Sequence, residues 1–192
     1  MNKKRLFFDM DGVLVNFQTG IDKQSKETLK EYEGRYDEIP GIFGLMEPMP
    51  GAIEAVQKLN QHYDCYILST APWKNPSAWS DKVIWITKYL DDVFHKRMII
   101  THCKNLCKGD IIIDDRDKNG TKEFEGEWIQ YGSAQYPDWQ NSREVILFIG
   151  KRYVRNGVAP LPQRHCVMVA VSLRLFFFPH KQYSFLDNLE WM

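Results

Sequence analysis

Aspartates follow two short apolar segments of the chain at the point where each segment ends. Asp9 and Asp11 follow the segment 6–8, and Asp114 and Asp115 follow the segment 111–113. Short apolar runs bounded by polar residues are typical of buried strands. Because the carboxyl ends of parallel strands meet at one edge of a sheet, we expect the four carboxylates to gather there.

Apolar runs and helical patterns alternate through the middle of the chain. Strands are expected over 65–68, 98–100, 111–113 and 127–131, and helices are expected to begin near residues 51 and 80. In the first helix Ile53, Val56 and Leu59 recur at three-residue spacing after a Pro-Met-Pro-Gly start. This alternation predicts an α/β fold: a doubly wound parallel sheet, covered by helices on both faces, that binds ligands beyond its carboxyl edge.

Residues 17–47 interrupt this pattern with a polar, helix-like stretch. Four helix-breaking residues punctuate it: Gly34, Pro40, Gly41 and Gly44. We interpret 17–47 as a small helical cap inserted into a core made of 1–16 and 48–150, with a closing helix over 141–150.

Residues 151–192 differ in composition from the rest of the chain. Basic residues dominate there: Lys151, Arg152, Arg155, Arg164, Arg174 and Lys181 against Asp187 and Glu190. Two interpretations of this C-terminal extension stay open, an extra edge strand with a loop or a segment that comes from an altered reading frame.

The charges of the chain balance, with 25 Lys and Arg against 25 Asp and Glu. A nucleic acid polymer normally needs a clustered basic surface, so we expect a small anionic ligand instead. The longest apolar stretch, 166–178, contains Arg174 and is shorter than the roughly 20 residues that cross a bilayer. With four irregularly spaced cysteines and no export signal, the chain is expected to be a soluble, cytoplasmic protein with reduced thiols and no membrane contact.

The spacing of the first two aspartates favours a metal site. Residues two apart on an extended segment face the same side, so Asp9 and Asp11 converge before Gly12 turns the chain. A hard divalent cation offsets the repulsion between such carboxylates, and Mg²⁺ prefers carboxylate oxygens, a backbone carbonyl and water. The alternative is that these aspartates are helix N-caps or solvated loop acids.

Hydroxyl groups follow the strand at 65–68. Ser69 and Thr70 offer hydroxyls and backbone N–H groups where an anion can sit, and Lys82 comes at the start of the next helix. Together with a metal, such donors make a phosphate receptor. Taken singly, the hydroxyls are also explained by a turn or cap, and Lys82 by a solvated helix charge.

Four segments in this order resemble the motifs of the haloacid dehalogenase superfamily of phosphatases. They are DMDGVL from Asp9, STAP from Ser69, Lys82 on the following helix, and IIIDDR from Ile111. Within that superfamily the chain is most similar to the 5′(3′)-deoxyribonucleotidases, whose segments resemble DMDGVLVNF, EPMPGAIEAV, DKVIWITKYL and IDDR of this chain. The likeness covers roughly residues 5–142.

The resemblance implies a two-step phosphoryl transfer through an aspartyl-phosphate. Asp9 is then the nucleophile, bound to magnesium. Asp11 donates a proton to the leaving nucleoside oxygen and next activates the water that hydrolyses the intermediate, while its backbone carbonyl touches the metal. An aspartate nucleophile divides one difficult displacement into two easier ones.

The resemblance also assigns the ligands around these two aspartates. Asp115 is the second carboxylate ligand of the metal, and Asp114 is either a water-held ligand or an orienting group. Thr70, in preference to Ser69, and Lys82 hold the phosphoryl oxygens.

Two aromatic residues at the ends of the cap are candidates for substrate selection. In the resembling family, aromatic residues at the places of Phe17 and Phe43 sandwich the nucleobase, and stacking contributes roughly 1 to 3 kcal/mol per base. The alternative is that both pack the core of the cap. Nucleoside monophosphates are the expected substrates. The sequence leaves open whether the enzyme prefers deoxyribose or ribose, which base it prefers and which oligomeric state it adopts. A phosphatase for another small metabolite and a nucleotide-binding module without turnover are the rival functions.

Overall fold

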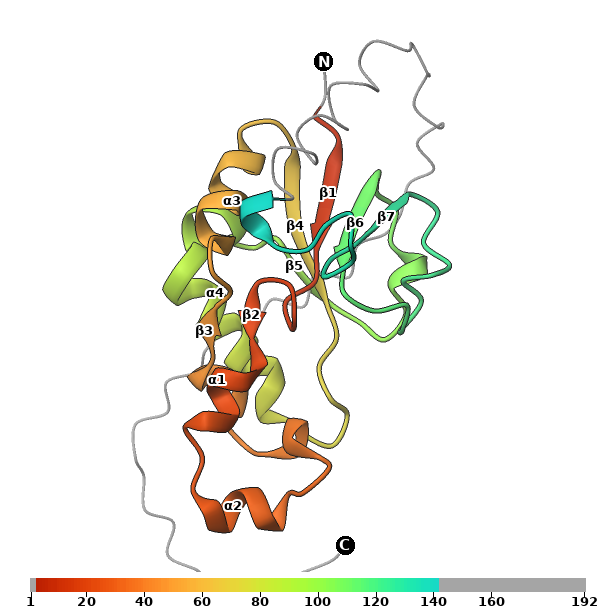
Figure 1. Ribbon diagram of the computed structural model, residues 1–192. Coiled ribbons are helices and arrows are strands. Elements are labelled where there is room, and N and C mark those ends of the chain that lie inside the picture. Colours follow the sequence, from red (N-terminus) through yellow and green to blue (C-terminus); the bar gives the residue numbers. More distant parts are fainter. Residues whose placement is uncertain (1–2, 142–192) are drawn as a thin grey trace, which may run out of the picture.

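Five parallel strands form the central sheet of the computed structural model, which describes residues 3–141. The strands are β1 Arg5–Phe8, β4 Asp64–Ser69, β5 Met98–Ile100, β6 Ile111–Asp114 and β7 Glu127–Gln130. Their order is β5-β4-β1-β6-β7, and every neighbouring pair is parallel (Figure 1). The chain builds one side of β1 first and then crosses to the other, so the order reverses at β1, as expected for a doubly wound α/β fold.

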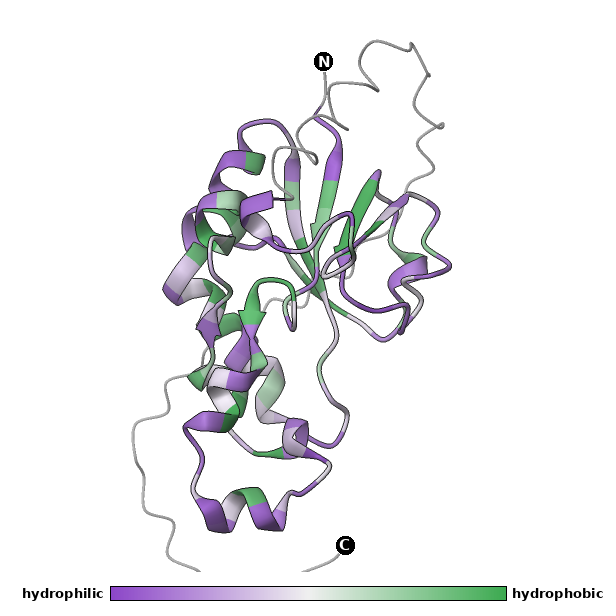
Figure 2. Cartoon of the chain, in the orientation of Figure 1, coloured by the Kyte–Doolittle hydropathy of each residue, from purple (hydrophilic) through white to green (hydrophobic). Residues whose placement is uncertain are grey.

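Alternate residues of the strands face opposite sides of this sheet. Leu6 and Phe8 belong to the larger apolar cluster, and Phe7 between them belongs to a smaller one. The strands are apolar along most of their length because both faces are covered, which Figure 2 shows as green in the middle of the sheet.

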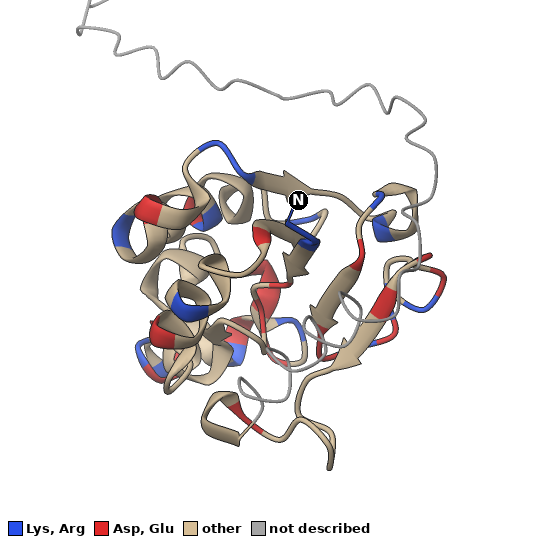
Figure 3. Cartoon of the chain, turned by 90° about the horizontal axis from the view of Figure 1, so that it is seen from above, with Lys and Arg blue, Asp and Glu red and all other residues tan. Residues whose placement is uncertain are grey.

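Helices cover one face of the sheet. They are α3 Ala52–Asn60 and α4 Ser77–Phe94, both of which bury apolar residues in the larger cluster. Helix α4 is longer than the expected 80–90, and Leu90 interrupts its helical backbone with φ −147°. Figure 3 shows acidic and basic residues interspersed on the helices, in keeping with the balanced charge.

The opposite face differs from the expectation of a second helical layer. In the described part of the chain, loop residues such as Phe124 and Cys107 pack there against Phe7, Leu68 and Ile112. The connections 101–110 and 115–126 are short, and the first holds only the 3₁₀ helix η3 Lys104–Leu106. Neither connection contains an α-helix, so loops cover this face of the sheet in the described residues.

The segment 17–47 forms short helices at the carboxyl edge of the sheet, below it in Figure 1. These are α1 Phe17–Asp22, α2 Lys26–Glu31, and the 3₁₀ helices η1 Tyr36–Glu38 and η2 Ile42–Leu45. Asn16 and Ser25 cap the first two helices through their side-chain oxygens. Two short antiparallel strands, β2 Val15–Asn16 and β3 Glu47–Pro48, join both ends of the segment.

Buried side chains of α4 and the loop before it help to attach this segment. The buried Asn75 side chain donates to the carbonyl oxygens of Asp37 and Ile39, both at 2.9 Å. The Trp85 indole donates to the carbonyl oxygen of Met46 at 3.0 Å. Both donors are buried, so each bond replaces one that water would otherwise make.

Two expectations from the sequence, the closing helix over 141–150 and the extension 151–192, lie outside the described residues apart from Asn141. Among residues 3–141, the structure has no helix that combines the length and the apolar character needed to span a membrane.

Candidate active site

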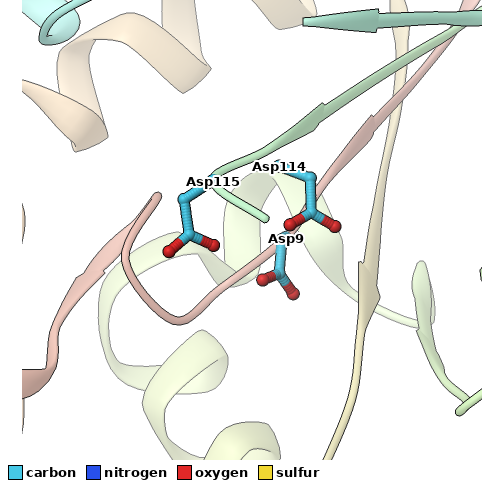
Figure 4. A group of neighbouring side chains, drawn as sticks. All are labelled: Asp9, Asp114 and Asp115. Atoms are coloured by element: carbon cyan, nitrogen blue, oxygen red, sulfur yellow. The ribbon is translucent and has the colours of Figure 1, made fainter. Parts of the chain in front are cut away.

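Three aspartates meet where β1 and β6 end. Asp9 directly follows β1, Asp114 is the last residue of β6 and Asp115 comes next (Figure 4). One carboxylate oxygen from each lies within 4.8 Å of the other two. Asp9 and Asp114 are buried and Asp115 is partly exposed, so the sequence-based expectation that these residues converge at the carboxyl edge is confirmed.

A glycine lets the next turn pass close to this cluster. Gly12 has φ +75°, and a Cβ atom there would lie 2.5 Å from Oδ2 of Asp115. An alanine at this position is therefore both strained and in collision with the carboxylate. Asp11, whose side chain is 18% exposed, lies just before this turn and lines the same cavity as Asp9 and Asp114.

Three buried carboxylate oxygens accept no hydrogen bond from the residues that the structure describes. They are Oδ1 of Asp9, Oδ1 of Asp11 and Oδ1 of Asp115. Two of them nevertheless face a cationic side chain in an ion pair: Oδ1 of Asp9 lies 3.1 Å from the Lys104 ammonium, and Oδ1 of Asp115 lies 3.5 Å from Nε of Arg116. The carboxylate of Asp114 differs, because its Oδ2 accepts from Lys104 at 2.5 Å and from Thr121 at 2.7 Å, and its Oδ1 accepts from the backbone of Arg116 at 3.0 Å. Buried carboxylate oxygens that accept no hydrogen bond are suited to bind a metal cation.

Burial and crowding shift the proton affinities in this cluster. Burial raises the pKa of Asp11, the charge of Lys82 opposes this shift, and the charge of Asp9 adds to it. Burial likewise raises the pKa of Asp115 to about 6, with Arg116 opposing and the Asp9 and Asp114 charges adding to the shift. Both carboxyl groups therefore hold a proton more readily than an exposed aspartate does.

The sequence-based interpretation missed a second buried lysine, Lys104. Its ammonium lies 3.1 Å from Oδ1 of Asp9 in an ion pair and donates to Asp114, and the residue is 2% exposed. Burial alone would lower the pKa of Lys104, but the charges of Asp9 and Asp114 outweigh it and raise that pKa. One feature of the sequence could have indicated Lys104. It is the first Lys, Arg, Asp or Glu after the strand that ends at Ile100, in the loop at the carboxyl edge of the sheet.

The predicted phosphate ligands lie in different surroundings. The Thr70 hydroxyl donates to the carbonyl oxygen of Thr101 at 2.7 Å, and Thr70 lines the cavity at the carboxyl edge. Ser69 is fully buried and does not line this cavity. Lys82, also buried, donates to Oδ2 of Asp11 at 2.7 Å and to the hydroxyl oxygen of Ser69 at 3.3 Å.

This cavity collects four of the nine predicted site residues and four residues that were not predicted, among them Lys104. Its walls are Asp9, Asp11, Thr70, Lys104, Asp114, Arg116, Lys118 and Asn119. A pocket lined by both acidic and basic side chains is suited to an anion that arrives with a cation.

The two predicted base-stacking residues contact each other. The rings of Phe17 and Phe43 lie with centroids 5.8 Å apart at 60°. Phe43 is 3% exposed and belongs to the apolar core, whereas Phe17 is only partly buried against it. The packing alternative therefore describes Phe43 in this structure, and Phe17 retains an accessible surface.

The family model and the relatives that match this chain all belong to one family. Residues 20–147 match the family model described as 5′ nucleotidase, deoxy (pyrimidine), cytosolic type C protein. A putative 5′(3′)-deoxyribonucleotidase of Vibrio phage KVP40 is 54% identical, covering 72% of this chain and 81% of that protein. A putative 5′(3′)-deoxyribonucleotidase of Staphylococcus epidermidis is 32% identical over 70% of this chain and 86% of its own length. The human 5′(3′)-deoxyribonucleotidase, cytosolic type, is 29% identical over 65% and 76%.

Proposed function

Because this chain belongs to the 5′ nucleotidase, deoxy (pyrimidine), cytosolic type C family, we propose that it hydrolyses deoxyribonucleoside monophosphates to nucleoside and phosphate. The observation that carries the proposal is the cavity that joins Asp9, Asp11 and Lys104 in one place. A phosphate ester needs a nucleophile, a proton donor and a positive charge, and this cavity offers one of each.

The donor set of the cavity fits Mg²⁺, which we include in the proposal. Beside this cavity, Asp9 and Asp115 each have a buried oxygen that makes no hydrogen bond and faces a cationic side chain, and these carboxylates and the Asp11 backbone would hold the ion. When bound, it supplies positive charge to the phosphoryl oxygens. Asp114 would act as an orienting group, because both of its oxygens already accept hydrogen bonds.

The first chemical step would transfer the phosphoryl group to Asp9. A carboxylate oxygen of Asp9 attacks phosphorus, the bond from phosphorus to the nucleoside oxygen breaks, and Asp11 gives its proton to that oxygen. The raised pKa of Asp11 favours the protonated form that this step requires. Lys104, 3.1 Å from Asp9, lies where it can hold a phosphoryl oxygen.

The second step would release phosphate and restore the enzyme. Asp11, now a carboxylate, takes a proton from water as that water attacks the aspartyl-phosphate, and the bond between Asp9 and phosphorus breaks. Thr70 lines the cavity on the opposite side from Arg116 along the sheet edge, so its backbone N–H and the Arg116 guanidinium are further candidates for phosphoryl contacts.

The substrate's base would stack on Phe17, at the end of the cap nearest to β2. Phe17 keeps accessible surface and rests on the buried Phe43, which holds it in place. Two further parts of the proposal are the division of the chain into core and cap, with the cap at 17–47, and a cytoplasmic location.

Phosphate release from a panel of substrates tests the proposal. The panel holds deoxyribonucleoside and ribonucleoside monophosphates and sugar phosphates, each with Mg²⁺ and with a chelator, beside the variant Asp9→Asn. We expect Mg²⁺-dependent release that favours deoxyribonucleotides and disappears in the variant. Phosphate release from sugar phosphates alone would contradict the proposed substrate class. Phosphate release that persists in Asp9→Asn would contradict the proposed role of Asp9 as the nucleophile.

A further inference from the structure

Two buried lysines serve different aspartates in this site. Lys104 pairs with Asp9 and lines the cavity, whereas Lys82 pairs with Asp11 and does not line it. Both side chains are almost fully buried, at 3% and 1% exposed. Their different places at the sheet edge indicate different tasks.

All directions around the Lys82 ammonium are taken by the protein. It donates to Asp11 at 2.7 Å and to Ser69 at 3.3 Å, and it lies 4.8 Å from the centroid of the Phe43 ring. An ammonium has three N–H donors, and two oxygens and one aromatic face account for them. Contact with a phosphoryl oxygen would require Lys82 to give up one of these partners in a place that water does not reach.

The partners of Lys82 also fix its position. Ser69 is the last residue of β4, in the middle of the sheet, and Lys82 itself is on the second turn of α4. Phe43 comes from η2 and is part of the apolar core. A lysine held by strand, helix and cap at once is a rigid support for whatever its ammonium binds.

We propose that Lys82 is a positioning residue that holds the carboxyl group of Asp11 in place for proton transfer, and that it is not a ligand of the phosphoryl group. The inference rests on the proposed function, because it assigns Asp11 the proton transfer to the leaving oxygen. It departs from the phosphate-holding role that the family resemblance gives to Lys82, a role that passes to Lys104.

Leaving-group dependence separates these two roles. A nucleoside alcohol is a poor leaving group and needs the proton from Asp11, whereas p-nitrophenolate leaves with little help. The test compares Lys82→Met with the matched control Lys88→Met, an exposed lysine on the same helix. kcat/KM is measured for a deoxyribonucleoside monophosphate and for p-nitrophenyl phosphate, because it reports the steps up to formation of the aspartyl-phosphate.

We expect Lys82→Met to lose about 100-fold in kcat/KM on the nucleotide and less than about tenfold on p-nitrophenyl phosphate. Competitive inhibition by inorganic phosphate should stay unchanged, and Lys88→Met should match the wild type in all three measurements. Equal loss on both substrates, no loss on either, or a weaker inhibition by phosphate would overturn the proposal.

Two further measurements keep the outcome interpretable. Circular dichroism and the melting temperature show whether Lys82→Met is folded, and if it is not, the same ratio is taken from Lys82→Gln, which keeps an N–H donor toward Asp11. If the wild type cleaves p-nitrophenyl phosphate but no nucleotide, the proposed substrate fails, and glycerol phosphate replaces the nucleotide in the comparison. A wild type that cleaves no phosphate ester would overturn both the proposed function and this inference.

Discussion

The carboxyl edge of the sheet and the segment 17–47 are built in opposite ways. At the sheet edge, charged groups are buried and hold one another: Asp9, Asp114 and Lys104 are each less than 5% exposed. The segment 17–47 consists of helices of three to six residues, and α2 buries none of its residues. It is attached to α4 and the loop before it through apolar residues of 39–46 that belong to the core and through buried donors, among them Asn75 and Trp85.

This difference indicates where chemistry and selectivity reside. The paired strands β1 and β6 fix the backbone of Asp9 and Asp114, so the distances within the carboxylate cluster change little as the molecule fluctuates. Short helices that bury few of their residues, such as α2, open at a lower free-energy cost. We therefore expect damage at the sheet edge to affect every substrate, and damage in the cap to affect nucleotides in particular.

The largest effect is expected from Lys104→Met. Removing the ammonium takes away a positive charge beside Asp9 and the donor to Asp114, and loss of one such stabilising group typically costs about 100- to 1000-fold in turnover. The loss should be similar for nucleotides and for p-nitrophenyl phosphate. Steady-state kinetics checks this, with Lys108→Met, an exposed lysine in the same connection, as the control. A loss confined to nucleotides would break the distinction between the two regions.

A smaller and selective effect is expected from Phe17→Ala. If the base stacks on Phe17, removal of the ring should lower kcat/KM for nucleotides by about tenfold or more and leave p-nitrophenyl phosphate nearly unaffected. Tyr32→Ala, another partly buried aromatic residue of the cap, is the matched control. Equal losses on both substrates would assign Phe17 to packing alone.

Asn75→Ala tests how firmly the cap is attached. The substitution leaves the carbonyl oxygens of Asp37 and Ile39 without their buried donor, which should destabilise the protein by about 1 to 3 kcal/mol. Denaturant unfolding gives the free energy, and hydrogen exchange should show faster exchange in 36–46 than in β1 and β6. Uniform acceleration across the sheet would show that cap and core open together.

An effect that is confined to the higher pH range is expected from Asp115→Asn in the metal-free protein. Burial raises the pKa of Asp115 from 3.8 to about 6, so the folded state holds this proton more tightly than the unfolded chain. The associated stability is present at low pH and is lost as the pH rises from 3.8 to about 6.

Asparagine removes this penalty, so the variant should be more stable than the wild type by about 1 to 3 kcal/mol at about pH 8 in chelator. The difference should shrink as the pH falls below 6. Thermal unfolding over this pH range measures it. A variant that is less stable than the wild type at the higher pH would contradict the inference that buried, crowded carboxylates destabilise the sheet edge.

The sequence predicted the parts of the site that follow directly from strand ends. Asp9, Asp11, Asp114 and Asp115 follow apolar runs, and parallel pairing of β1 with β6 brings those runs together. The same logic predicted all five strands of the sheet but not its second face. Helices there were an expectation from the fold class, and the described connections 101–110 and 115–126 contain no α-helix.

Lys104 and the partners of Lys82 could not be read from spacing in the same way. Lys104 reaches Asp9 because η3 and the register of β5 with β4 place it there, and no local pattern encodes that contact. The place of Lys82 was predicted at the start of a helix, but its pairing with Asp11 across 71 residues depends on how α4 lies against η2. Long-range packing decides both.

The central claim is that the sheet edge carries covalent phosphoryl transfer to Asp9. Rapid acid quenching of Asp11→Asn with p-nitrophenyl phosphate labelled at phosphorus tests this most directly, because the substrate needs little acid help and the variant lacks the base for the second step. We predict that labelled protein accumulates and that peptide mapping places the phosphate on Asp9. Release of p-nitrophenol without labelled protein, or a label on another residue, would contradict the account.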